Sequence, residues 1–114
     1  MEDCIFCKIV KGDIPSEKVY EDELILAFKD ISPSAPTHVL VIPKKHIKNL
    51  NELSDNDAKI ISHIYIKIKE LAQQLDINEK GYRVVTNCGE QGGQTVEHIH
   101  FHLLGGRNLQ WPPG

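Results

Sequence analysis

Three histidines alternate with apolar residues near the C-terminal end of the chain, at His98, His100 and His102. Alternate side chains of an extended strand share one face, so these imidazoles are expected on one face and the residues between them in the core. A neutral imidazole nitrogen, with a pKa of about 6.5, is a good nucleophile near pH 7 and can form a phosphoryl- or nucleotidyl-histidine. Residues four apart on a strand are separated by about 13 Å, so one ion with bonds of about 2 Å cannot bind all three. The spacing therefore predicts divided roles.

A glycine-rich segment directly precedes these histidines. Residues 89–95 read Gly-Glu-Gln-Gly-Gly-Gln-Thr. Glycines allow backbone N–H groups to approach anionic oxygens closely, as in other phosphate sites, and Thr95 adds a hydroxyl. The combination favours attack on the phosphorus of a bound phosphate derivative.

The elements that position these residues follow from periodicity and turn signals. Ser54 is a good N-cap with Asp57 three residues later, and apolar residues then recur at helical spacing up to Leu75, which predicts one long helix. A short helix is expected over residues 4–11. Strands are expected over residues 18–21, 24–29, 38–43, 82–87 and 96–104. Hairpin-type connections and one main helix predict an α+β fold, with a five-stranded antiparallel sheet and helices on one face.

Composition places the chain among ordinary globular proteins. Its 114 residues fit one domain over 1–114, and 40% hydrophobic with 25% charged residues excludes disorder as the main state. A net charge of −3 argues against general nucleic-acid binding. No stretch approaches the roughly 20 apolar residues of a membrane helix, so no membrane partner is expected. Three cysteines, an odd count, and an acidic N-terminus unlike a secretion signal favour the cytoplasm.

The histidine segment resembles a known family signature. Residues 98–104, His-Ile-His-Phe-His-Leu-Leu, match the H-φ-H-φ-H-φ-φ pattern of the histidine triad (HIT) family, in which φ is apolar. Further stretches resemble its Hint-like branch in the same order along the chain: residues 30–33, 35–38, 41–46, 105–107 and 111–114.

The resemblance implies a fold and an activity. Hint-like proteins are homodimers in which two five-stranded sheets join into one ten-stranded sheet, and the tail over residues 105–114 would contribute to the dimer and the active site. They bind purine nucleoside monophosphates. They hydrolyse nucleoside phosphoramidates and aminoacyl-adenylates through a nucleotidyl-histidine and release AMP, with no cofactor required for catalysis.

The resemblance also implies a role for each matching residue. His100 would be the nucleophile, its other nitrogen held by a backbone carbonyl, while His102 and His38 would line the phosphate site. Thr95 would contact phosphate and assist the leaving group. The remaining implied contacts are with ribose (Asp30), base (Phe6 and Ile31), phosphate (Asn87 and Gly93) and the partner subunit's pocket (Trp111).

A structural metal site is implied as well. Cys4 and Cys7 form a C-x-x-C pair with zinc-like spacing, and a closed tetrahedral site needs two further ligands. The pattern resembles bacterial HIT proteins and galactose-1-phosphate uridylyltransferase, in which two cysteines and histidines placed like His46 and His98 bind structural zinc. The alternative is a pair of buried thiols that behave as small apolar residues, beside hydrogen-bonded histidines.

Two alternatives to phosphoramidate hydrolysis stay open. A dinucleoside polyphosphate hydrolase would act through the same nucleophile, although that branch usually has Gln at the position of His102. A non-catalytic nucleotide-binding interaction module would use the same pocket, but it would not need a nucleophile.

Overall fold

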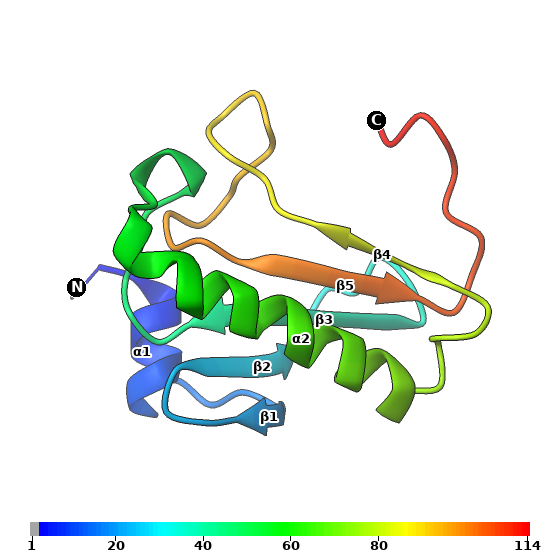
Figure 1. The fold of residues 1–114 in the computed structure, drawn as a ribbon, viewed down its shortest axis with the longest axis horizontal. Coiled ribbons are helices and arrows are strands. Elements are labelled where there is room, and N and C mark those ends of the chain that lie inside the picture. Colours follow the sequence, from blue (N-terminus) through cyan, green and yellow to red (C-terminus); the bar gives the residue numbers. More distant parts are fainter. Residues whose placement is uncertain (1–2) are drawn as a thin grey trace.

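The computed structural model describes residues 3–114, which form a five-stranded sheet with two α-helices (Figure 1). The sheet order is β1-β2-β3-β5-β4, and every neighbouring pair is antiparallel. This confirms the predicted α+β class. The elements are α1 (Ile5–Lys11), β1 (Lys18–Glu21), β2 (Ile25–Lys29), β3 (Thr37–Pro43), 3₁₀ turns at Leu50–Glu52 and Asp55–Asp57, α2 (Ala58–Gln74), β4 (Tyr82–Val85) and β5 (Phe101–Gly105).

The two helices cover opposite faces of the sheet, so the expectation that both lie on one face is wrong for α1. Helix α2 packs on the face that contains Ala27 and Val41, whereas α1 packs through Phe6 and Ile9 on the face that contains Leu26. The central strands explain the difference. Nearly every residue of β2 and β3 is buried, so both faces of these strands need cover.

The histidine segment is extended but joins the sheet later than predicted. Strand β5 begins at Phe101 instead of residue 96, and β4 ends at Val85 instead of residue 87. Phe101 pairs with Val41 in the last register pair of β5 with β3, and the backbone before it has other partners. The Ile99 N–H donates to the Ile47 carbonyl at 2.6 Å, and the Thr86 hydroxyl donates to the His100 carbonyl at 2.9 Å.

Local signals fix the helix ends. The predicted capping box between Ser54 and Asp57 is present, and it begins a 3₁₀ turn that continues into α2 at Ala58. The Cys4 side chain caps α1 by accepting from the Cys7 N–H at 3.3 Å. Gly12 follows in the left-handed region at φ 86° and ends α1. No helix within residues 3–114 has the length and apolar character needed to cross a bilayer.

Asp22 ties the β1–β2 turn to α2. One carboxylate oxygen accepts from the backbone N–H groups of Leu24 and Ile25, at 2.8 and 3.0 Å. The other accepts from the Tyr20 hydroxyl at 2.7 Å and from His63 Nε2 at 2.6 Å. Burial opposes ionisation, but the bonds from His63, Tyr20 and the two amides outweigh it and hold the pKa of Asp22 well below its usual range.

Replacing Asp22 is expected to destabilise the fold. Asp22→Asn should lower the free energy of unfolding at pH 7 by about 1–3 kcal/mol. The charge-assisted hydrogen bonds are lost, and an amide side chain cannot accept from all four donors that the carboxylate now satisfies. Urea denaturation measures the change. Glu23→Gln replaces an exposed side chain in the same turn and should shift the free energy of unfolding by less than about 0.5 kcal/mol.

The sign of the pH effect follows from the lowered pKa. As pH falls below about 4, the unfolded chain takes up a proton at Asp22 before the folded chain does, so the wild type loses this contribution. The stability gap between wild type and Asp22→Asn should narrow there. An equal difference in stability between the two proteins from pH 7 to pH 3 would contradict the lowered pKa of Asp22.

Candidate functional site

A cavity of about 280 Å³ lies between α1, β2 and the histidine segment. Its wall is mostly apolar, with a few polar groups, which is the usual composition of a small-molecule site. Six of the residues singled out from the sequence line it: Phe6, Asp30, Ile31, Thr95, His100 and His102. The structure therefore brings together residues from four separate stretches of the chain.

Four other predicted site residues are not walls of this cavity, and one of them, His38, reaches it only through its contact with His102. Asn87 and Trp111 line a separate hollow between β4 and the C-terminal tail, where Trp111 is 81% exposed. The Arg83 guanidinium holds that tail by donating to the carbonyls of residues 109 and 110. Gly93 lines a third hollow at the glycine-rich loop, which shares Thr95 with the cavity.

His100 is buried and held in one orientation. Its Nδ1 lies 2.8 Å from the His98 carbonyl oxygen, which can only accept, so Nδ1 carries the hydrogen and Nε2 keeps its lone pair. The Phe6 ring packs edge-on against this imidazole, with ring centroids 5.1 Å apart. His100 therefore presents a nucleophilic nitrogen at the cavity wall.

His38 and His102 form a second hydrogen-bonded chain. The Ser34 backbone N–H donates to His38 Nδ1 at 3.0 Å, so His38 carries its hydrogen on Nε2. That hydrogen faces His102 Nδ1 at 2.9 Å, with an Asp30 carboxylate oxygen 3.4 Å from the same Nε2. His102 is then protonated on Nε2, which is buried and has no partner among the described residues. A buried N–H of this kind costs free energy until a ligand oxygen or water accepts from it.

The His38 and His102 rings are both neutral at pH 7. Burial, followed by the charges of His100 and His38, lowers the pKa of His102 to about 4, although Asp30 opposes the shift. Burial also lowers the pKa of His38, again against Asp30. Neutral rings are what the hydrogen-bond directions require.

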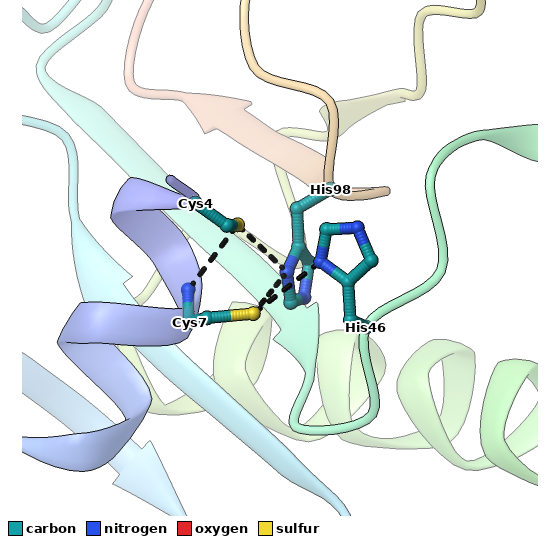
Figure 2. A group of neighbouring side chains, drawn as sticks. All are labelled: Cys4, Cys7, His46 and His98. Atoms are coloured by element: carbon teal, nitrogen blue, oxygen red, sulfur yellow. Dashed lines mark hydrogen bonds between the residues drawn. The ribbon is translucent and has the colours of Figure 1, made fainter. Parts of the chain in front are cut away.

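A second group of side chains gathers around His98, the first of the three alternating histidines: Cys4 and Cys7 from the N-terminal end of α1, and His46 from the segment after β3 (Figure 2). Cys4 Sγ lies 3.4 Å from His98 Nδ1, and Cys7 Sγ lies 3.3 Å from His46 Nδ1 and 3.6 Å from His98 Nδ1. The four ligand atoms are all within 4.8 Å of one another. Zinc bonds of about 2.3 Å to sulfur and 2.0–2.1 Å to nitrogen place tetrahedral S and N ligands about 3.5 Å apart. The four residues are therefore a candidate metal-binding group with suitable spacing.

The surroundings prepare this group for a cation. His98 Nε2 donates to the Pro43 carbonyl at 2.8 Å, which leaves its Nδ1 lone pair free toward the sulfurs. Burial and the neighbouring Cys4 raise the pKa of the Cys7 thiol, so two adjacent thiolates need a positive charge to form.

Two partners of the histidines were not foreseen from the sequence. The Ser34 N–H and the Pro43 carbonyl are backbone groups, and backbone groups leave no residue-type signal. The apolar lining from Ile9, Ile14 and Leu40 was also missed, although the alternation in β3 offered a signal for Leu40.

Comparison with known proteins agrees with this arrangement. The HIT domain family model matches residues 11–109. An uncharacterized HIT-like protein of Synechococcus elongatus is 52% identical over 99% of this chain and 98% of its own length. A HIT family hydrolase from Legionella pneumophila has a TM-score of 0.97 at 54% identity, covering 98% of this chain and all of that one. A histidine triad nucleotide-binding protein from Candida albicans has a TM-score of 0.83 at 39% identity, covering 96% and 83%.

His102 is expected to titrate far below an ordinary histidine. An NMR pH titration of its ring signals should give a midpoint near 4, because burial disfavours the charged ring. Asp30→Asn should move the midpoint lower still, since the carboxylate favours the protonated ring. Asp13→Asn removes an equal charge from an exposed position after α1 and should leave it unchanged. A midpoint near 6.5 would contradict the geometry.

Proposed function

This chain belongs to the HIT domain family, and we propose that it is a purine nucleotide-binding hydrolase that cleaves nucleoside phosphoramidates or aminoacyl-adenylates and releases AMP. The observation that carries the proposal is the 2.8 Å contact between His100 Nδ1 and the His98 carbonyl. It makes Nε2 of a buried, cavity-lining imidazole the free nucleophile. A hydrolase role agrees with the Legionella relative and nucleotide binding with the Candida relative.

In the first step His100 Nε2 attacks the phosphorus. A bond forms from Nε2 to phosphorus as the phosphorus–nitrogen bond of a phosphoramidate breaks. The leaving nitrogen of the phosphoramidate keeps the bonding electron pair and takes a proton from solvent, assisted by a hydrogen bond with the Thr95 hydroxyl. In an aminoacyl-adenylate the bond that breaks is the phosphorus–oxygen bond, and the aminoacyl carboxylate leaves with the electron pair and needs no proton. The His98 carbonyl stabilises the positive charge that develops on the His100 ring.

Water completes the reaction in the second step. Its oxygen attacks the same phosphorus, the Nε2–phosphorus bond breaks, and the electron pair returns to Nε2. One proton goes back to solvent, so the sum for a phosphoramidate is substrate plus water giving AMP and the free amine, and for an aminoacyl-adenylate the products are AMP and the amino acid. The His102 Nε2–H, directed by His38, donates to a phosphoryl oxygen in both steps.

The cavity supports the proposed contacts to the nucleotide. Phe6 and the 98% exposed Ile31 provide apolar surface for a purine, and the Asp30 carboxylate is an acceptor for ribose hydroxyls. Thr95 joins the cavity to the hollow that contains Gly93, which supports a phosphate site between them. The Asn87 contact with phosphate stays a part of the proposal.

The proposal includes a homodimer with a continuous sheet. Strand β4 is at one end of the sheet, so its outer backbone groups have no strand partner among residues 3–114. Tyr82 on β4 and Trp111 in the adjoining tail are exposed. An open edge beside exposed aromatic residues supports pairing of two copies, with Trp111 reaching the partner subunit's pocket.

Zinc is the ion proposed for Cys4, Cys7, His46 and His98. Two thiolates with two imidazoles form a closed tetrahedral set that leaves no position for water, so the ion is structural. Its charge would neutralise the two thiolates. All three cysteines are unpaired, which suits a reducing compartment such as the cytoplasm.

The catalytic proposal is tested with adenosine 5′-phosphoramidate and intact-protein mass measurement. The wild type should turn the substrate over or carry an AMP adduct. His100→Ala should lose the adduct and at least about 10³-fold in kcat, because the nucleophile is absent. Cys88→Ser should retain both. Turnover that persists in His100→Ala would overturn the nucleophile assignment, and AMP binding without turnover in the wild type would indicate a binding module.

The metal proposal is tested by metal content. Native mass spectrometry should find one zinc per chain in the wild type and none after Cys4→Ser combined with Cys7→Ser. Cobalt substitution should give the visible absorption of a tetrahedral thiolate site. Cys88→Ser is again the matched control. Zinc retained by the double variant would place the ion elsewhere.

A further inference from the structure

We propose that the metal-binding group is coupled to the nucleotide cavity, so that a cation at Cys4, Cys7, His46 and His98 and a nucleotide at His100 strengthen each other's binding. This inference rests on the proposed function. It assigns His98 as a positioning residue, and it makes metal occupancy a control on nucleotide affinity as well as on stability.

The first connection is His98 itself. Its ring nitrogen Nδ1 faces the two sulfurs at 3.4 and 3.6 Å, while its backbone carbonyl accepts from His100 Nδ1 at 2.8 Å. The same residue therefore serves both groups. A cation that fixes the His98 ring restricts the adjoining peptide and, through it, the tautomer and direction of the nucleophile.

The second connection is α1. Cys4 and Cys7 flank Phe6, whose ring lies edge-on to His98 and His100 with centroids 5.9 and 5.1 Å away. Phe6 also lines the cavity, as does Ile9 from the next turn. A helix of seven residues has little stability by itself, so its position depends on what anchors it. A bound cation would anchor the N-terminal end of this wall.

The third connection runs through the segment after β3. His46 supplies the fourth ligand, and the carbonyl of the next residue, Ile47, accepts from the Ile99 N–H at 2.6 Å. Both residues that flank Ile99 belong to the site: His98 to the metal group and His100 to the cavity. Binding at His46 would thus also restrain the histidine segment through the Ile47 carbonyl.

Coupling of this kind must be reciprocal. If zinc orders the cavity wall, nucleotide binds the loaded protein more tightly, and zinc binds the nucleotide complex more tightly by the same factor. A factor of about 10–100 is expected, within the usual range for coupled sites.

The experiment compares zinc-loaded and chelated full-length protein in two independent ways. Hydrogen exchange should show that zinc protects residues 5–11 and 98–100, whereas the centre of α2 stays unchanged. Calorimetry should show AMP binding the loaded form about 10–100-fold more tightly. Cys88→Ser should behave as wild type. Cys4→Ser, which keeps a good N-cap for α1 but lacks one thiolate, should behave as the chelated form.

The outcomes separate this inference from the proposed function. Equal exchange at residues 5–11 and 98–100 in both forms, or equal AMP affinity, overturns the coupling. If the loaded protein does not bind AMP, the proposed function fails, and the exchange comparison alone decides whether zinc positions the segment. If the chelated protein does not stay folded, zinc affinity of the loaded protein is measured against a chelator with and without AMP. An unchanged affinity there would also overturn the coupling.

Discussion

The site depends on one constraint: an extended segment must bury apolar side chains on one face and hold imidazoles on the other. Ile99, Phe101 and Leu103 are buried in the core under α2, at 0–2% exposure. Their burial fixes the register of the whole segment, since a shift by one residue would place histidines in an apolar core. The histidines between them must then lie on the opposite face, where α1 and the cavity are. Hydrophobic packing therefore positions the chemistry.

Neighbouring hydrogen-bond partners, two backbone carbonyls and the His38 side chain, then set which ring nitrogen of each histidine is free and whether it carries a hydrogen. His98 has its Nε2 hydrogen bonded by a carbonyl, so Nδ1 faces the thiols; His100 has Nδ1 bonded by a carbonyl, so Nε2 is free. His102 receives a hydrogen bond on Nδ1 from His38, so its Nε2 is a donor. One residue type thus presents free ring nitrogens of three kinds, which the proposed function uses as a metal ligand, a nucleophile and a hydrogen-bond donor. The difference lies in which ring nitrogen each partner occupies.

That the three alternating histidines share one face could be predicted from the sequence, because strand periodicity and apolar spacing are local properties. The sequence also located the strands and the long helix. It failed where the outcome depends on distant backbone. Strand β5 starts late because Ile99 and His100 bond to Ile47 and Thr86 instead of to a neighbouring strand. Helix α1 lies on the other face because β2 needs cover there. The Ser34 amide and Pro43 carbonyl, which set two tautomers, could not be inferred from residue types.

The charge balance of the cavity explains why neutral histidines suit this chemistry. Lys29 is the only lysine or arginine among the described residues that line the cavity. Its Nζ lies 2.9 Å from a carboxylate oxygen of Glu17. In the proposed function, the phosphate would therefore be held mainly by neutral donors such as His102 Nε2–H and Thr95. Neutral donors orient the phosphoryl oxygens without the tight ground-state ion pair that a free lysine would form with them. Under the proposed mechanism, binding energy would then be available for the geometry in which His100 Nε2 meets phosphorus, where it lowers the barrier.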